Sequence, residues 1–378
     1  MSLDHVLAGK RLVVCVGPGG VGKTTVSAAI GLAAARAGRK AFVLTIDPAK
    51  RLADALGLDG LDDTTRRVPT ERVGTDTGDG ELYAAMVDTG SSFDALIERI
   101  TEEGPTRQRI FDNRVYQAVS RSLARSHAYV AMERLYHAVT AEGHDLVVLD
   151  TPPARNAIDI LDAPRQLARF LDSAVVEWFL PGTTDEGPKS LGARILARGG
   201  QMAKGLLKRV TGEQLFDGIL GFLAAFAELR QGFQERAEAV DEILRESTTA
   251  YILVSSGSPS AVDDAAWLRD DLRTRDIEVD AVVFNASYVP VDPDAPQRIR
   301  TSVPALAAGA SPLQQTLRAL RADAAHTNAV IETIVAGLRA ELSSRTAVIR
   351  TPRFAEEVRD LPQLAALADM LRRPGQLA

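Results

Sequence analysis

Cysteine and long apolar runs are scarce in this sequence. Cys15 is the only cysteine among 378 residues, so no internal disulfide can form, and its place in the apolar run 11–17 predicts a buried core residue. No uninterrupted apolar stretch reaches the roughly 18 residues of a membrane helix. The N-terminus also lacks the basic and apolar segments of a signal peptide. We therefore expect a cytoplasmic protein without an integral membrane segment.

The patterns of several other functions are missing as well. No Gly-x-Ser-x-Gly elbow of a hydrolase is present, and the net charge of −6 argues against a nucleic-acid partner, which usually calls for a basic face. The histidines show no close metal-ligand spacing; they are His5, His127, His137, His144 and His326. The 46% of hydrophobic residues nevertheless supply a sizeable core.

Short apolar runs alternate with helical patterns along most of the chain. Most of the runs are continuously hydrophobic, which is typical of parallel strands that helices cover on both faces. This alternation predicts an α/β fold, with a doubly wound, mainly parallel sheet of about seven strands. The runs are 11–17, 41–46, 82–87, 146–150, 250–256, 280–285 and 346–350.

One long segment, 155–247, breaks this alternation because it contains helical periodicity and no convincing strand. We expect an α-helical subdomain there, inserted into a nucleotide-binding core whose first part is 1–154 and whose second part is 248–378. Two stretches rich in Pro, Gly, Asp or Ala, 181–190 and 289–312, are predicted to be loops.

A phosphate-binding loop is the strongest motif. Gly17 to Thr24 fits Gly-x-x-x-x-Gly-Lys-Thr, after a predicted strand and before the helical run 23–36. Backbone N–H groups and the helix dipole would bind phosphate, Lys23 would neutralise the β- and γ-phosphates, and the Thr24 hydroxyl would ligate Mg²⁺. The motif predicts ATP and Mg²⁺ as cofactors. Its binding residues are Gly17, Gly19, Gly20, Val21, Gly22, Lys23, Thr24 and Thr25.

Two aspartates follow predicted strands near this loop. Asp150 ends a buried strand, where a carboxylate can stand behind a Mg²⁺ ion, although it could instead cap the helix that follows. Asp47 ends the strand after the phosphate-loop helix and also suits a helix N-cap, because Pro48 follows it. The two roles of Asp47 are compatible, since an N-cap at this edge of the sheet lies close to the γ-phosphate.

These segments together resemble the deviant-Walker ATPases, the family of the arsenical pump-driving ATPase ArsA and of the targeting factor for tail-anchored membrane proteins. The similar segments are 19–25, 45–56, 149–157, 283–285 and 352–359; the run from Asp150 to Pro164 resembles the actinobacterial branch. The resemblance implies that Asp47 activates the attacking water, and that Asn285, Pro352 and Arg353 contact the adenine.

The sequence departs from this family in three places. The family's signature lysine, which reaches a partner's nucleotide across a dimer interface, is replaced by Pro18. A partner or another residue such as Arg155 must then supply the cation, or hydrolysis is slow. Cys15 alone cannot bind metalloid as the cysteines of ArsA do, so arsenite efflux is not expected. The Cys-x-x-Cys zinc clamp of the targeting factor is also absent.

The predicted insertion suggests a client or partner. Its apolar side chains either line a groove for a hydrophobic client or form the subdomain's own core or a partner interface; they are Phe216, Leu220, Phe222, Leu223 and Phe226. A basic string is either a solvated face or a membrane-surface contact; it comprises Arg194, Arg198, Lys204, Lys208 and Arg209.

We therefore expect a cytoplasmic Mg·ATP-hydrolysing ATPase that couples nucleotide state to rearrangement of the helical subdomain. It would act as a homodimer or as a heterodimer with a related ATPase. The alternative is a nucleotide-binding subunit of a two-ATPase complex that hydrolyses ATP weakly or not at all. Pro18 favours this alternative, and Asp47 with Asp150 argue against it. A partition-type ATPase fits the long insertion poorly, and no acceptor site of a kinase is recognisable.

Overall fold

The structure, a computed structural model, describes residues 2–47, 51–70, 80–87, 98, 104–113, 117, 127–171, 232, 234–288, 312–354 and 357–372. Contacts divide the chain into two compact units. The first comprises Met1–Met86, Glu142–Ile158 and Glu246–Ala378, and the second comprises Val87–Ala141 and Asp159–Arg245. The second unit thus includes residues 87–141, which the sequence did not set apart from the core, and the extent of the helical insertion stays a prediction.

The first unit contains an eight-stranded sheet in the order β3-β4-β2-β5-β1-β6-β7-β8. Every neighbouring pair is parallel except β3 and β4. The strands are β1 (Leu12–Val16), β2 (Lys40–Thr45), β3 (Arg66–Arg67), β4 (Glu81–Met86), β5 (Leu146–Asp150), β6 (Thr249–Ser256), β7 (Ala281–Tyr288) and β8 (Ala347–Pro352).

The predicted fold class is confirmed, and the seven apolar runs correspond to seven of the eight strands. The central strands β1 and β5 are buried at every position, as expected for parallel strands covered on both faces. The sequence missed β3, which is antiparallel at the edge beside β4. Its two residues, Arg66 and Arg67, are both exposed arginines and give no hydrophobic signal.

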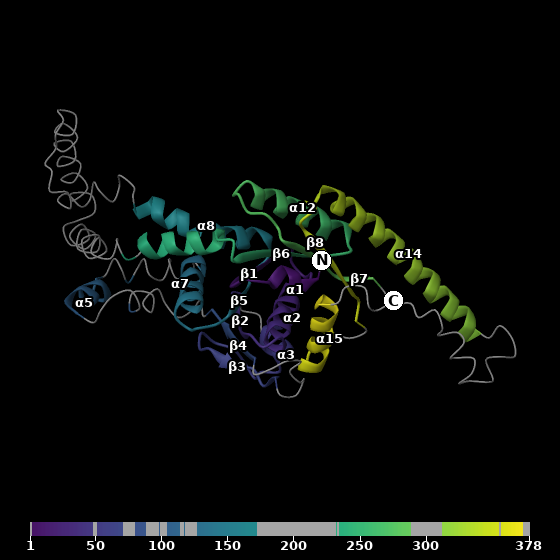
Figure 1. The fold of residues 1–378 in the computed structure, drawn as a ribbon, viewed down its shortest axis with the longest axis horizontal. Helices are drawn as coiled ribbons and strands as arrows, with labels where there is room; N and C mark the ends of the chain where they lie inside the picture. The colour runs from purple at the N-terminus through teal and green to yellow at the C-terminus, as the bar shows by residue number, and fades with distance from the viewer. Residues whose placement is uncertain are drawn as a thin grey trace, which may run out of the picture. The chain divides into compact units, whose positions relative to one another are not determined.

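Helices cover the two faces of this sheet. The helices α1 (Leu3–Leu7), α2 (Lys23–Arg36), α3 (Arg51–Leu56) and α15 (Leu361–Arg372) contribute to one apolar core with alternate residues of the strands. Figure 1 shows α12 (Pro259–Arg273) and α14 (Pro312–Glu341) on the other side of β6 and β7. The helix predicted over 23–36 coincides with α2, which is buried along most of its length because alanines and Gly31 let it lie close to the sheet.

The strand order brings three loops to one edge of the sheet. β5 lies between β1 and β2, and Asp150 is in register with both Cys15 and Thr45. From β1 the chain crosses to β2 on one side, whereas β6, β7 and β8 follow on the other. Such a switch point, at the carboxyl ends of parallel strands, is where ligands bind in open α/β sheets.

The second unit is helical in its described part, with α5 (Pro105–Phe111), α7 (His127–Thr140), most of α8 (Ala154–Leu171) and helical residues 234–245. Asp241 accepts from Arg165 and from Arg245, at 3.0 Å and 3.1 Å. Arg236 pairs with Glu133 of α7. The predicted client residues 216–226, the basic string 194–209 and the loop 181–190 lie outside the described residues. So does the predicted loop 289–312, except for Pro312, which begins α14.

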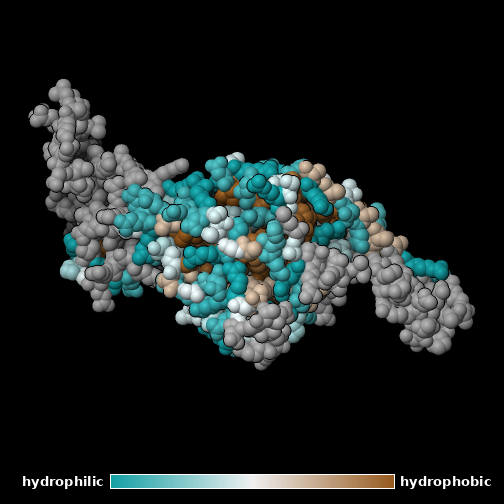
Figure 2. Space-filling view, viewed as in Figure 1, coloured by the Kyte–Doolittle hydropathy of each residue, from teal (hydrophilic) through white to brown (hydrophobic). Residues whose placement is uncertain are grey.

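Most large apolar side chains of the described residues are buried. Figure 2 shows a mostly hydrophilic face, with smaller apolar patches toward its middle and along one edge. Trp267, Leu320 and Val330 are the large apolar side chains classed as exposed among the described residues. None of the described helices combines the length and apolar character needed to span a bilayer.

Candidate nucleotide-binding site

The phosphate loop connects β1 to α2, and two of its glycines are required by close approaches. A Cβ on Gly17 would lie 2.1 Å from the carbonyl oxygen of Val254 in β6. Gly22 has φ +86° and a Cβ there would lie 2.3 Å from Nδ2 of Asn285, so this position combines a left-handed backbone with no space for a side chain. The loop is therefore held closely against β6 and β7, and a glycine-rich loop of this kind can present backbone N–H groups to an anion.

Lys23 begins α2 and is 8% exposed. Its Nζ donates to the carbonyl oxygen of Pro18 at 2.7 Å. Burial lowers the pKa of the Lys23 ammonium, while the negative charges of Asp150 and Asp47 act in the opposite direction. The Lys23 side chain thus folds back over its own loop. A phosphate that enters the site would supply a negative charge to offset the loss of water around the Lys23 ammonium.

A single buried carboxylate organises the hydroxyl groups below the loop. The Oδ2 atom of Asp150 accepts from Oγ1 of Thr24 and from Oγ1 of Thr45, both at 2.8 Å. Ser27 donates to Oδ1 at 3.4 Å. Asp150 is 0% exposed, and burial raises its pKa to about 6 against the lowering effect of the hydroxyls and of Lys23.

Asp47 lies at the end of β2, two residues after Thr45, and is half-buried. Its backbone N–H donates to Oγ1 of Thr45 at 3.2 Å, so Thr45 links Asp47 to Asp150. The preceding residue, Ile46, donates its N–H to the carbonyl oxygen of Asp150 at 3.1 Å. The two predicted aspartates are thus brought together, and the charge of Asp47 acts on Lys23.

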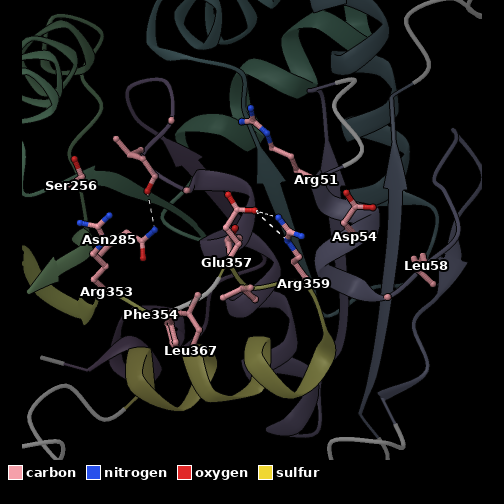
Figure 3. Close-up of a pocket in the computed structure, with 17 residues that line it drawn as sticks. Arg51, Asp54, Leu58, Ser256, Asn285, Arg353, Phe354, Glu357, Arg359 and Leu367 are labelled. Atoms are coloured by element: carbon pink, nitrogen blue, oxygen red, sulfur yellow. Dashed lines mark hydrogen bonds and ion pairs between the residues drawn. The ribbon is translucent and has the colours of Figure 1, made fainter. Parts of the chain in front are cut away.

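A cavity of about 950 Å³ opens beside the phosphate loop (Figure 3). Loop residues, the helix α3, the end of β7 and the segment after β8 all contribute to its lining. The lining residues that the sequence had singled out are Gly20, Val21, Gly22, Thr25, Asn285 and Arg353. Its volume suits a nucleotide, since ligand pockets span about 300–1,000 Å³.

Asn285 is fixed at the wall of this cavity. Its Nδ2 donates to the carbonyl oxygen of Val21 at 2.9 Å, and its Oδ1 accepts from Oγ1 of Thr351 at 2.9 Å. The next residue, Ala286, has φ +49°, and the β7–β8 register shifts between Phe284 and Tyr288. One amide hydrogen and one lone pair of Asn285 remain, which is the donor and acceptor pair that the edge of an adenine requires.

The segment after β8 forms another wall. Pro352 ends β8 in register with Tyr288, and the next residue, Arg353, lines the cavity near Asn285 in Figure 3. Phe354 and Leu367 add an apolar surface at this end.

Several functional candidates were missed by sequence reasoning. Thr45 and Ser27 are single hydroxyls within a strand and a helix, and Thr351 lies 66 residues from its partner Asn285. Phe354, Arg51 and Asp54 line the cavity without belonging to the phosphate-loop motif. Thr45, Arg51 and Asp54 lie within the segment 45–56 that the sequence had singled out, and Phe354 lies within 352–359, but no role was predicted for these side chains.

The donors present fit a phosphate and a hard cation. Lys23 and the loop backbone supply positive groups, and Thr24 with Asp150 supply the oxygen chemistry that Mg²⁺ prefers. Because Thr24 gives its hydrogen to Asp150, its lone pairs stay available to a cation. In the described part of the chain no cluster of three or more His, Cys, Asp or Glu residues is placed to hold a metal ion. A cation here would therefore need oxygens of the nucleotide as additional ligands.

A phosphate loop between a central parallel strand and its following helix, with an aspartate ending the neighbouring strand, defines a P-loop nucleotide-binding protein. The sequence model of the family described as anion-transporting ATPase matches residues 10–178. This part of the chain is therefore similar to the ArsA-like family of P-loop ATPases.

Three relatives show the extent of the similarity. An uncharacterized protein of Streptomyces coelicolor is 29% identical over 73% of this chain and 62% of its own length. A Halobacterium salinarum protein named as an arsenical pump-driving ATPase is 26% identical over 43% of this chain and 25% of its own. The ATPase GET3 of Malassezia globosa is 23% identical over 76% of this chain and 77% of its own length. The chain thus spans less than two thirds of the first two relatives, and the Streptomyces match agrees with the expected actinobacterial likeness.

We expect Lys23→Ala to weaken Mg·ATP binding by about 10²-fold or more, because a buried phosphate group would lose its charged donor. Isothermal titration calorimetry measures this directly. Lys10→Ala is the matched control, because Lys10 is bonded to Ser247 and Thr249 at the opposite end of β1. Equal affinities in wild type and Lys23→Ala would contradict the assignment of the loop.

The buried Asp150 carboxylate makes nucleotide-free stability depend on pH. Its pKa rises from 3.8 to about 6 on folding, so the folded state binds the proton more tightly, and stability falls as pH rises from about 4 to about 6. Above about pH 6 the buried carboxylate lowers the free energy of unfolding by its full amount, roughly 3 kcal/mol. Asp150→Asn should therefore raise the melting temperature at pH 7.5 and flatten its pH dependence. Calorimetric unfolding between pH 4.5 and 8 checks this, and an Asn variant less stable than wild type at pH 7.5 would refute it.

Proposed function

We propose that the chain is a Mg·ATP-hydrolysing ATPase. The observation that carries this proposal is the convergence of Lys23, Thr24, Asp150 and Asp47 at one sheet edge, beside a cavity of nucleotide size. Lys23 and the loop backbone bind the phosphates, and the cavity wall with Asn285 receives the base. Asp47, Lys23, Thr24 and Asp150 perform or support the chemistry, with ATP and Mg²⁺ as cofactors.

Each of these side chains has a distinct task. Asp47, half-buried at the phosphate edge, orients a water and accepts its proton as the water attacks the γ-phosphorus. Lys23 neutralises charge on the phosphoryl oxygens as the bond to the leaving oxygen breaks. Asp150 holds the Thr24 hydroxyl with its lone pairs outward. A bound Mg²⁺ supplies further neutralisation of the phosphate oxygens.

A second candidate is a nucleotide-binding subunit that hydrolyses ATP weakly or not at all. The observation that favours it is Pro18, whose buried ring offers no charge and whose carbonyl accepts from Lys23. Measured turnover decides between the candidates: a chain that binds Mg·ATP with no Asp47-dependent hydrolysis, alone or with a related ATPase, is this subunit.

The proposal includes coupling of the nucleotide to the rest of the chain. Thr151 donates to the carbonyl oxygen of Cys15 at 2.7 Å, and the N–H of Ala154 donates to the carbonyl oxygen of Gly17 at 3.1 Å. α8 begins at Ala154 and continues past Ile158, where the second unit begins. A change at the loop can therefore be passed directly to α8. A homodimer, or a heterodimer with a related ATPase, and a hydrophobic client of the second unit are the expected partners.

Asp47→Asn should keep Mg·ATP affinity within a few fold and lower the steady-state rate by roughly 10²–10⁴, the usual worth of a positioned general base. Asp59→Asn, in the exposed turn after α3, is the matched control. A phosphate-release assay with saturating ATP measures the rate. Turnover at the wild-type level in Asp47→Asn would place the base elsewhere.

The hydroxyl of Thr24 should determine the Mg²⁺ requirement. Thr24→Ala is expected to raise the Mg²⁺ concentration for half-maximal turnover by about 10-fold, the loss of one oxygen ligand, whereas Thr24→Ser retains the hydroxyl and stays near wild type. Titration of Mg²⁺ into EDTA-treated protein with fixed ATP measures this concentration. Identical Mg²⁺ curves for Ala and Ser variants would remove Thr24 from the metal site.

A further inference from the structure

The nucleotide cavity contains a cationic side chain that does not belong to the phosphate-loop motif. Arg51 is the first residue of α3 and lines the same cavity as Gly20, Gly22 and Thr25. Figure 3 shows it at the end of the cavity away from Phe354 and Leu367. The apolar and the cationic ends therefore suit the two ends of a nucleotide, the base and the phosphates.

α3 holds Arg51 in this position by burial of its other face. Leu52, Ala53 and Leu56 are buried, and they pack α3 onto the core that includes α2 and α15, while Arg51 is exposed. Asp54 lines the cavity one turn later, but in the part of the chain that the structure describes no ion pair joins it to Arg51. The pKa of Glu357, which also lines the cavity, is lowered by its hydrogen bond with Arg359 and further by the charge of Arg51. An anion that enters the cavity would therefore compete with Glu357 for the Arg51 guanidinium.

The charge of Arg51 already acts on the phosphate-binding lysine. Among the causes that lower the pKa of Lys23, burial is the largest, and the positive charge of Arg51 contributes in the same direction. Two cations that repel each other at one site are stabilised together when a multiply charged anion lies between them. A triphosphate in the cavity would be such an anion.

The other arginines of this region are placed differently. Arg359 is bound to Glu357 at 2.7 Å, and Arg353 lies near Asn285 at another wall. Arg155 is exposed in the first turn of α8 and does not line the cavity. The sequence had suggested Arg155 as a replacement for the missing signature lysine, but the cavity favours Arg51.

We propose that Arg51 is the chain's own phosphate-binding cation, which contacts the β- and γ-phosphoryl groups and replaces in cis the charge that Pro18 lacks. This inference rests on the proposed ATP site and adds a specific residue to it. A guanidinium suits the role because its fork binds two phosphate oxygens, and an arginine supplied in cis can stabilise the charge that develops during phosphoryl transfer.

The test compares Arg51→Ala, Arg51→Lys and Arg155→Ala with wild type, by calorimetric titration with AMP, Mg·ADP and Mg·ATP and by steady-state turnover. We expect Arg51→Ala to leave AMP affinity within about 2-fold, to weaken Mg·ATP about 10–100-fold, and to lower turnover about 10³-fold. Arg51→Lys should recover part of the Mg·ATP affinity but less of the turnover, because it keeps the charge and loses the fork. Arg155→Ala should match wild type.

Other outcomes overturn the inference. Unchanged Mg·ATP affinity in Arg51→Ala would contradict it. An equal loss of affinity for AMP and for Mg·ATP would also contradict it, because it would place the side chain at the ribose or the base. A loss of turnover in Arg155→Ala alone would assign the cation to α8 instead. The comparison of AMP, Mg·ADP and Mg·ATP affinities does not depend on hydrolysis. It therefore tests the role of Arg51 even if the chain hydrolyses ATP only weakly. If the wild-type chain binds no nucleotide, the proposed ATP site itself is wrong. If the wild type binds Mg·ATP and Arg51→Ala binds it equally well, only the role of Arg51 is wrong.

Discussion

The site depends on one carboxylate that three hydroxyl groups share. Asp150 is wholly buried at the end of β5, and the donors that reach it come from α2 and β2. The Thr45 hydroxyl reaches Asp150 only if β2 and β5 keep their register, since the two residues are direct partners across the sheet. The carboxylate that orients the Thr24 hydroxyl is therefore held by the same contacts that hold the centre of the sheet together.

This arrangement puts the nucleotide-free protein under electrostatic strain. Burial disfavours the charged form of Asp150 and of Lys23, and their mutual attraction compensates only in part. The Lys23 ammonium donates to a backbone carbonyl, that of Pro18. An empty site of this kind is stabilised by its ligand, so nucleotide affinity and folding stability are linked through the same two charges.

The sequence was sufficient for the fold and for the centre of the site. Continuous apolar runs predicted the parallel strands, and the spacing from Gly17 to Thr24 predicted the loop and the start of α2, because both are local patterns. Asp47 and Asp150 could be placed since carboxyl ends of parallel strands share an edge.

What the sequence could not supply depends on pairings distant along the chain. Arg51 is an ordinary surface residue until α3 is packed beside the cavity, and Asn285 acquires its hydrogen-bond geometry from Val21 and Thr351. The edge strand β3 consists of two arginines that pair with β4 through the backbone, and Arg67 also forms an ion pair with Glu81 of β4 at 3.2 Å.

The strand order also has a consequence for synthesis on the ribosome. β1, which carries the phosphate loop, pairs only with β5 and β6, and not with β2, the next strand to emerge. β1 thus gains both of its neighbouring strands only when the chain has been made through Ser256, more than half of its length, and the loop meets Asn285 of β7 later still. Until then ATP has no completed site to bind and cannot help the nascent chain to fold, so these early strands must wait for distant partners, the situation in which chaperones are most needed.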